Sequence, residues 1–432
     1  MSDMTCLFQN VRYLTPDFTV AEGCIGVSGK EIVYIGTEPP QNATPETVID
    51  GCGKLLLPGL VNTHTHLAMS LLRGYGENLS LQDWLFTRIF PFEAKLTGEA
   101  IYWGTLLSIA ESLRFGVTSA TDMYMDVDAV CRAAAVSGFK INASLMAPVG
   151  GDDKAEQPFV GVAKALADWH NYDGGRIKID SYIHAEYTTD EQRSRLMRDL
   201  AVKHGLNMHL HLSETKLEHE ECKQRHGGLT PAAWFASLGV LDVPTTVAHA
   251  VWVEPADIEL LAEHGATVAH NPISNLKLAS GIAPVPAMLD AGVNLALGTD
   301  SAASNNNLNL WEEMKLMGLL HKANCANPTL ITPQQVLRAA TVGGALSQGR
   351  QDTGEIAVGK KADLQLVDIS QPHMHPCHDM LNNLVFAAQG SDVVLTMVDG
   401  QILYHNGEYP TLNLPEIIAH VEAERQRILA RL

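Results

Sequence analysis

The chain of 432 residues carries 30 Lys and Arg against 49 Asp and Glu, a formal net charge of −19. This charge would repel nucleic acids and anionic membranes, and no local basic cluster offsets it, so we expect a small-molecule partner instead. The seven cysteines are scattered and form no C-x-x-C pair, which is typical of a reduced protein without a thiolate zinc site. Without a recognisable signal peptide or a membrane-spanning apolar run, the sequence predicts a soluble, cytoplasmic protein.

Short β-like runs separated by turns fill residues 1–57, for example CLFQNVRYL (6–14) and EIVYIG (31–36). The same style returns in residues 356–432, in ADLQLVDI (362–369) and VVLTMVDG (393–400). We expect these two segments to pair with each other in one small composite β-sandwich domain built from both termini. The last stretch, 413–432, predicts an amphipathic helix that starts near a proline.

Between residues 58 and 355, short apolar runs alternate with longer amphipathic stretches. KINASLM (140–146) and LNMHLHLSE (206–214) are examples of the apolar runs, and EPADIELLAEHG (254–265) has the apolar spacing of a helix. This alternation is typical of βα units around a parallel sheet, and roughly eight units fit in the span. The sequence therefore predicts an α/β fold, with a (β/α)₈ TIM-type barrel over residues 58–355.

The first predicted barrel strand ends in two histidines, in LLLPGLVNTHTH (55–66). Residues two apart on a strand share a face, so His64 and His66 would project the same way and make a good pair of metal ligands. Active sites of such barrels lie where the strands end. Later predicted strands also end in polar residues, namely His209, His211 and Glu214, then His249, His270 and Asp300.

Three imidazoles and one carboxylate form the ligand set that we select from these strand ends: His64, His66, His211 and Asp300. This donor set suits zinc, with iron(II) as the alternative, and leaves room for a water. His209 shares a face with His211, but we expect His211 to be the ligand because Glu214 follows it by three residues. We expect His209 to be buried and hydrogen-bonded, and His270 to be structural. Glu214 is placed to shuttle a proton, with helix capping as its alternative role.

Five of these segments, taken together, resemble the amidohydrolase superfamily: PGLVNTHTH, HLSE, VAHAVW, VAHNPISNLKLASG and LGTDSAASNN. They are most similar to its branch of 5-methylthioadenosine/S-adenosylhomocysteine deaminases, and the resemblance covers nearly the whole chain. It implies metal-dependent hydrolytic deamination of an adenosine-type nucleoside to the inosine analogue and ammonia. The substrates that it implies are 5′-methylthioadenosine, 5′-deoxyadenosine, adenosine and S-adenosylhomocysteine.

The resemblance also assigns roles to individual residues. It implies that His64, His66, His211 and Asp300 bind one zinc ion, and that Asp300 takes the proton of the attacking water. Glu214 would protonate a ring nitrogen, His249 would orient the hydroxide, Glu93 would grip the ribose hydroxyls, and His184 would be a further substrate contact. Because the fourth strand ends at His184, where two-metal members carry a modified lysine, the resemblance points to one metal.

One departure from the family concerns the 5′ group of the substrate. Members that accept S-adenosylhomocysteine use arginine from the region after the third strand, and this chain has no arginine between Lys140 and Gly175. A carboxylate without a guanidinium partner binds poorly, so we expect a preference for neutral 5′ groups. Trp84 and Leu81 could line an apolar 5′ pocket, although a Trp among leucines on a helix is more often a core residue.

Three other functions stay open at this point. The protein could be a hydrolase of another ring, such as guanine, a pterin or a triazine. It could be a cyclic amide hydrolase, which usually holds two metals, or an inactive relative that serves as a binding protein. HMHPCHD (373–379) is interpreted as a loop rather than a second metal cluster. A homo-oligomer is compatible with the composite β domain and the terminal helix.

Overall fold

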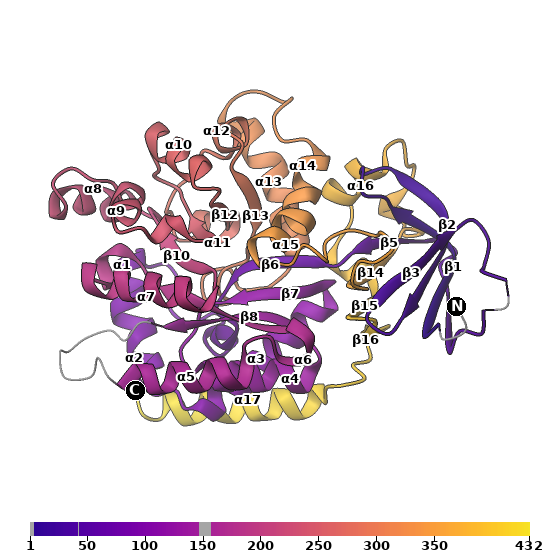
Figure 1. Ribbon diagram of the computed structural model, residues 1–432, viewed down its shortest axis with the longest axis horizontal. Helices are drawn as coiled ribbons and strands as arrows, with labels where there is room; N and C mark the ends of the chain where they lie inside the picture. Colours follow the sequence, from indigo (N-terminus) through magenta and orange to yellow (C-terminus); the bar gives the residue numbers. More distant parts are fainter. Residues whose placement is uncertain (1–3, 42, 147–156) are drawn as a thin grey trace.

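The computed structural model describes residues 4–41, 43–146 and 157–432. These residues form two eight-stranded sheets with helices around one of them (Figure 1). In the part of the chain that is described, no helix is both long and apolar enough to cross a membrane.

One sheet is a parallel barrel whose strands follow one another in chain order. The strands are β6 (Leu60–Thr65), β7 (Val117–Asp122), β8 (Lys140–Met146), β9 (Ile177–Ile183), β10 (Met208–Leu212), β11 (Thr245–His249), β12 (Thr267–His270) and β13 (Asn294–Leu297). The ring closes where Thr65 pairs in parallel with Asp300 and the Asp300 N–H donates to the His64 carbonyl at 3.0 Å. The predicted barrel is confirmed.

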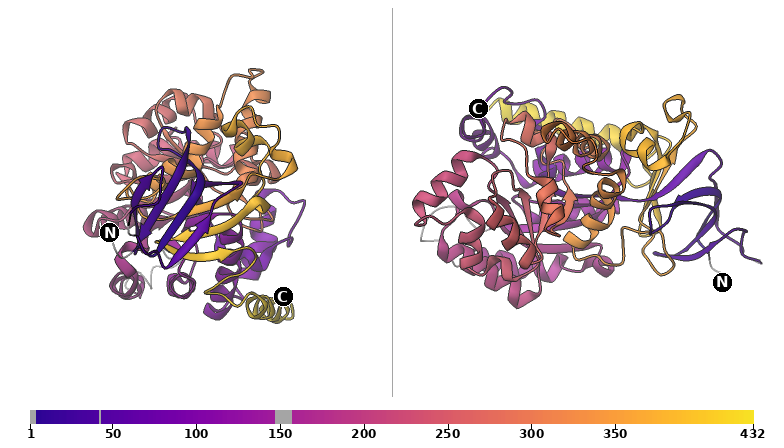
Figure 2. Two further views of the ribbon diagram at one scale, coloured as in Figure 1. Left: turned by 90° about the vertical axis from the view of Figure 1, so that its right-hand side faces the viewer. Right: turned by 90° about the horizontal axis from the view of Figure 1, so that it is seen from above.

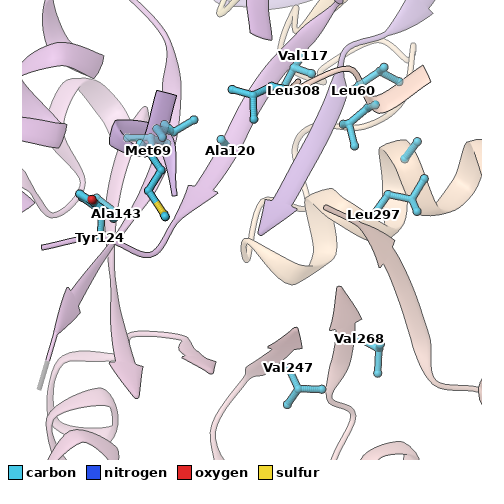
Figure 3. Packing of buried hydrophobic residues seen from close by; sticks show 14 of the residues in the cluster. Leu60, Met69, Val117, Ala120, Tyr124, Ala143, Val247, Val268, Leu297 and Leu308 are labelled. Carbon is cyan, nitrogen blue, oxygen red and sulfur yellow. The ribbon is translucent and has the colours of Figure 1, made fainter. Parts of the chain in front are cut away.

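Burial on both faces explains why the barrel strands are apolar over most of their length. Leu60, Val117, Val247, Val268 and Leu297 lie on separate strands, and all are at most 2% exposed (Figure 3). Buried side chains fill the barrel interior, which is therefore a packed core rather than a channel.

Helices connect the strands and cover the outside of the barrel. They are α1 (Leu81–Trp84), α2 (Phe90–Glu93), α3 (Gly98–Arg114), α4 (Val127–Ser137), α5 (Gln157–Trp169), α6 (Tyr172–Gly175), α7 (Glu191–His204), α8 (Lys216–Arg225), α9 (Pro231–Ser237), α10 (Pro255–Glu263), α11 (Pro272–Lys277), α12 (Val285–Asp290), α13 (Leu310–Asn324), α14 (Pro333–Arg338), α15 (Gly344–Ser347), α16 (Met380–Phe386) and α17 (Leu414–Leu429).

The second sheet is built from both ends of the chain, as predicted (Figure 2). Its strands are β1 (Cys6–Leu14), β2 (Val20–Ser28), β3 (Glu31–Gly36), β4 (Thr47–Asp50), β5 (Lys54–Pro58), β14 (Leu364–Asp368), β15 (Val393–Val398) and β16 (Gln401–His405). Hydrogen bonds link them in one mixed sheet, in which β5 joins the N-terminal strands to β14. Phe8, Ile25, Leu56, Leu366 and Leu395 share its apolar cluster.

The predicted C-terminal helix forms as α17, and it lies along the barrel rather than on the mixed sheet (Figure 1). It packs against α3, where the ring of His420 stacks on that of Trp103 with centroids 3.9 Å apart. The chain therefore returns from the mixed sheet to the barrel before it ends.

Candidate active site

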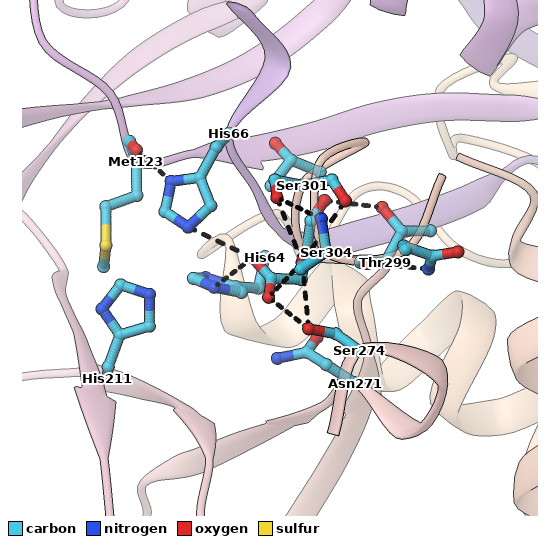
Figure 4. Close-up of polar contacts among 12 residues, drawn as sticks. His64, His66, Met123, His211, Asn271, Ser274, Thr299, Ser301 and Ser304 are labelled. Atoms are coloured by element: carbon cyan, nitrogen blue, oxygen red, sulfur yellow. Dashed lines mark hydrogen bonds and ion pairs between the residues drawn. The ribbon is translucent and has the colours of Figure 1, made fainter. Parts of the chain in front are cut away.

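The polar residues at the barrel strand ends converge at one rim. His64 comes from β6, His211 from β10 and His249 from β11, while Asp300 follows β13. Ligand atoms of His64, His66 and His211 lie within 4.8 Å of one another, and so do those of His64, His249 and Asp300. Figure 4 shows the rings of His64, His66 and His211 directed toward one region from two sides of the barrel.

His64 lies at the centre of this group. Its Nδ1 is 3.1 Å from Nε2 of His209, which is buried, so the expectation of a buried, hydrogen-bonded His209 is confirmed. Its Nε2 is buried and has no hydrogen-bond partner among the described residues, with the Asp300 carboxylate 3.5 Å away. Burial lowers the pKa of His64 to about 3, so this imidazole is neutral at physiological pH. A neutral, unpartnered ring nitrogen aimed into the site has the properties of a metal ligand.

The other two histidines of the set are oriented through backbone carbonyls. His66 Nδ1 donates to the carbonyl of Met123, and His211 Nδ1 donates to the carbonyl of His184 at 2.7 Å. These bonds leave Nε2 of each ring facing the site, where Nε2 of His66 pairs with Asp300 Oδ1 at 3.2 Å. Such carbonyl partners are the usual way in which proteins fix the tautomer of a metal-binding histidine.

Asp300 is held by two hydroxyls and by an unusual backbone conformation. Ser274 Oγ and Ser304 Oγ donate to its Oδ2 at 2.6 and 2.9 Å, which leaves Oδ1 toward the histidines. Its φ is +60°, and that of His249 is +72°, in the left-handed region that residues other than glycine rarely adopt. Such strained residues gather at functional sites, because the surrounding structure must hold them.

Three imidazoles, one of which has a buried ring nitrogen without a partner among the described residues, and one carboxylate form a donor set that fits zinc without a thiolate or further acid. All four predicted ligands are therefore brought together, with the side chain of His249 beside them.

Glu214 and His249 form the second part of the site. The Glu214 carboxyl is buried, accepts a hydrogen bond from Ser280 Oγ at 3.1 Å and lies 3.8 Å from His249 Nε2. His249 Nδ1 is 2.7 Å from the amide oxygen of Asn275. An amide oxygen can only accept a hydrogen bond, so His249 Nδ1 is the donor. Burial raises the pKa of Glu214, although His249 opposes the shift. A carboxyl with a raised pKa is suited to give a proton near neutral pH.

The remaining predicted residues surround this centre at different distances. Tyr124 Oη donates to Glu93 Oε1 at 2.8 Å, and the Tyr124 ring is 6.4 Å from that of His66. The ring of His184 is 4.8 Å from that of His211. Trp84 is buried in the apolar cluster of the barrel.

A cavity of about 490 Å³ opens beside Tyr124. Among the described residues, its lining has apolar side chains from Met125, Val127, Leu145 and Val162. It also has the carboxylates of Asp126, Asp128 and Asp168, the last of which pairs with Lys164. Part of the arginine-free segment of the sequence, residues 147–156, lies outside the described residues.

Comparisons with known proteins agree with this geometry. The amidohydrolase family model matches residues 55–403. The chain belongs to the amidohydrolase family. It is 45% identical over 420 residues to a protein of Dictyoglomus thermophilum named 5-methylthioadenosine/S-adenosylhomocysteine deaminase, covering 97% of this chain and 98% of that one. It is 39% identical over 434 residues to a 5′-deoxyadenosine deaminase of Methanosarcina mazei, covering all of both chains.

Solved structures extend the comparison to three dimensions. This amidohydrolase superposes on an adenosine deaminase from Xanthomonas campestris with bound zinc at a TM-score of 0.94 and 32% identity, over 99% of both chains. A triazine hydrolase from Arthrobacter aurescens superposes at a TM-score of 0.91 with 24% identity, covering 98% of this chain and all of that one, and so shares the fold.

Several residues that support the amidohydrolase site were not singled out in the sequence. Ser274, Asn275 and Ser280 hold Asp300, His249 and Glu214, and all three belong to the segment VAHNPISNLKLASG, where they look like ordinary loop residues. Tyr124 follows β7, and the polar end of that strand, TDMY, was a signal that could have indicated it.

Outside this site, the amidohydrolase has two weaker candidates for a metal-binding site. In HMHPCHD, His373 Nε2 pairs with the Asp392 carboxylate at 2.8 Å and joins no three-ligand group within the described ranges. Glu186, Cys222 and His226 do lie close together. Both carboxylate oxygens of Glu186 already accept from the guanidinium of Arg225, so a cation there would have to displace an existing ion pair.

Proposed function

We propose that this amidohydrolase deaminates an adenosine-type nucleoside by hydrolysis, giving the inosine analogue and ammonia. The observation that carries the proposal is the buried Glu214 carboxyl beside the four-residue ligand set, with His249 next to both. Relatives at 45% and 39% identity over nearly the whole chain are named as deaminases of nucleosides of this type, which supports the same chemistry here.

The metal that we propose is one zinc ion, held by His64, His66, His211 and Asp300, with iron(II) as the alternative. Bound there, it would supply the Lewis acidity that brings the pKa of water toward neutrality. A single ion is favoured because the β9 end carries His184. The nearest lysine on that strand, Lys178, donates instead to the Gly349 carbonyl at 2.8 Å, at the opposite end of the barrel.

The protein's own groups then account for the proton transfers. Asp300 accepts a proton from the attacking water, and His249 orients that water toward C6 of the purine. Glu214 gives a proton to N1 as the carbon–oxygen bond forms, which places the electron pair of the broken π bond on a neutral nitrogen. Asp300 then passes its proton to the C6 amino group, which leaves as ammonia, and the proton of the new C6 hydroxyl returns to Glu214, so that one water has been exchanged for one ammonia.

The ribose and the 5′ group are bound on the Tyr124 side of the site. Glu93 accepts from the ribose hydroxyls while Tyr124 holds its other side, and His184 is a further substrate contact. The cavity beside Tyr124 suits a methylthio or plain deoxy group, because apolar side chains face it and its described lining has carboxylates but no arginine for an amino-acid carboxylate. We keep Trp84 as a proposed wall of the 5′ pocket, although it is buried in the core cluster.

The test is direct. Zinc-loaded protein is incubated with 5′-methylthioadenosine, 5′-deoxyadenosine, adenosine and S-adenosylhomocysteine, and the change from adenine to hypoxanthine absorbance is followed. We expect the neutral nucleosides to turn over faster than S-adenosylhomocysteine. The reverse order would contradict the 5′ assignment alone, whereas no turnover of any of the four with metal bound would contradict the deaminase.

A further inference from the structure

A second buried carboxylate holds the turn that carries Glu214. Strand β10 ends at Leu212 and α8 begins at Lys216, so Glu214 lies in the short connection between them. Glu218, in the first turn of α8, directs its carboxylate back toward this connection. Its Oε1 accepts from the backbone N–H of Ser213 at 3.0 Å, and its Oε2 accepts from the backbone N–H of Glu214 at 2.8 Å.

The connection needs such support because its backbone is strained. Ser213 is fully buried and has a φ of +46°, in the left-handed region that serine rarely adopts. Its carbonyl accepts from the backbone N–H groups of Val251 and Trp252 at 3.1 and 2.9 Å. Ser213 is therefore held on its carbonyl side by the loop after β11 and on its N–H side by Glu218. A strained conformation of this kind persists only where its surroundings determine it.

Ordinary helix capping accounts for only part of the contacts of Glu218. Thr215 already caps α8, since its hydroxyl accepts from the Glu218 N–H at 3.2 Å. In the usual capping box, an acid at the Glu218 position returns a hydrogen bond to the capping residue itself. Glu218 also interacts with the backbone N–H of Thr215 in this way, but its hydrogen bonds at 3.0 and 2.8 Å go to the two residues before it, one of which is Glu214. It does so while buried and close to the Glu214 carboxyl, an arrangement that is costly for two acids.

We propose that Glu218 is a positioning residue for Glu214. By fixing the N–H groups of Ser213 and Glu214, it directs the Glu214 carboxyl toward Ser280 and His249, where the purine ring is bound. This inference rests on the proposed deamination, in which Glu214 is the proton donor. A proton donor that is displaced by about 1 Å loses much of its effect, on the order of 100-fold in rate.

The experiment is a double-mutant cycle between Glu218→Gln and Glu214→Gln, measured on 5′-deoxyadenosine after wild-type turnover has been established. Glutamine at 218 can accept from one of the two N–H groups, but its amide NH₂ meets the other donor. We expect E218Q to lower kcat roughly 10–100-fold with KM and bound zinc close to wild type. In the E214Q background, E218Q should cause no further loss, because the group that it positions is already gone.

Two further readouts separate positioning from general damage. Amide hydrogen exchange in the peptide covering residues 211–217 should rise in E218Q, and Glu220→Gln, at an exposed position on the same helix, should change neither exchange nor kcat. If E218Q does not fold, Glu218→Asp, which keeps the charge but shortens its reach, takes its place in the cycle. An equal loss of kcat in both backgrounds, a loss explained by missing zinc, or wild-type kcat in E218Q would overturn the inference. A wild-type protein inactive on every nucleoside would instead overturn the deaminase proposal.

Discussion

Nε2 of His209 lies 3.1 Å from Nδ1 of His64, and this contact leaves Nε2 of His64 as the ring nitrogen that faces the site. A histidine that binds a metal through Nε2 carries its proton on Nδ1, so His209 acts as the acceptor that selects this tautomer. Strand alternation places His209 two residues before the proposed ligand His211 and on the same face of β10. The strand thus supplies one proposed ligand and the partner of another.

Replacing His209 tests this relationship. We expect His209→Phe, which keeps a ring but has no acceptor, to weaken zinc binding about 10–100-fold. His209→Gln should lose less, because its amide oxygen can take the same proton. Zinc affinity is measured by competition with a chelator, with the melting temperature of the metal-free protein as the control for folding. Equal affinities for the two variants would show that His209 only fills space.

Removal of the Glu214 carboxyl should affect the chemical step. We expect Glu214→Gln to lower kcat for 5′-deoxyadenosine about 10²–10⁴-fold, since that is the range for a positioned proton donor. KM should change little, because the amide keeps the size of the side chain and its contact with Ser280. Steady-state kinetics on protein of equal zinc content measure both constants. A large rise in KM with unchanged kcat would show that Glu214 only binds the substrate.

Glu93 should determine affinity for the sugar rather than for the base. We expect Glu93→Gln to raise KM for nucleosides about 10–100-fold, since a hydrogen bond to a charged group is worth roughly 1.5–3 kcal/mol. Tyr124→Phe should act in the same direction but more weakly, because it removes only the hydroxyl that holds Glu93. The inhibition constant of free adenine is the internal control, and it should stay constant. An equal effect on nucleoside and free base would contradict the ribose assignment.

The sequence was sufficient to predict the barrel, and to predict that the four candidate ligands lie near one another, for one physical reason. Apolar strands that end in His or Asp stand out in a linear pattern, and a parallel barrel brings all strand ends to one rim. The residues at the strand ends therefore predict that His64, His66, His211 and Asp300 lie close together before any distance is known.

The residues that hold this set could not be predicted in the same way. Ser274, on α11, and Ser304, in the turn that follows Asp300, meet at one oxygen of Asp300 because the fold brings α11 to the end of β13, and neither spacing nor polarity indicates this. The partner of α17 was equally hidden. An amphipathic stripe shows that a helix packs on something, but only the structure shows that His420 lies on Trp103 of α3.

A buried histidine far along the chain should control acid stability. His321 is buried on α13, and its ring is 5.3 Å from that of His270. Burial lowers the pKa of His321 to about 4. The unfolded chain, with a histidine pKa of about 6.5, then binds more protons than the folded chain, so stability rises with pH across this interval.

We therefore expect the stabilisation to be complete above about pH 6.5 and to be lost as the pH falls toward 4. The shift from about 6.5 to about 4 corresponds to at most about 3 kcal/mol. His321→Phe should make the melting temperature less dependent on pH between 7 and 5, whatever it does to stability at pH 7. His204→Phe, at an exposed position on α7, is the matched control and should leave the slope unchanged. If the melting temperatures of H321F and the wild type fall by the same number of degrees between pH 7 and pH 5, then unfolding does not add a proton to His321 in this interval.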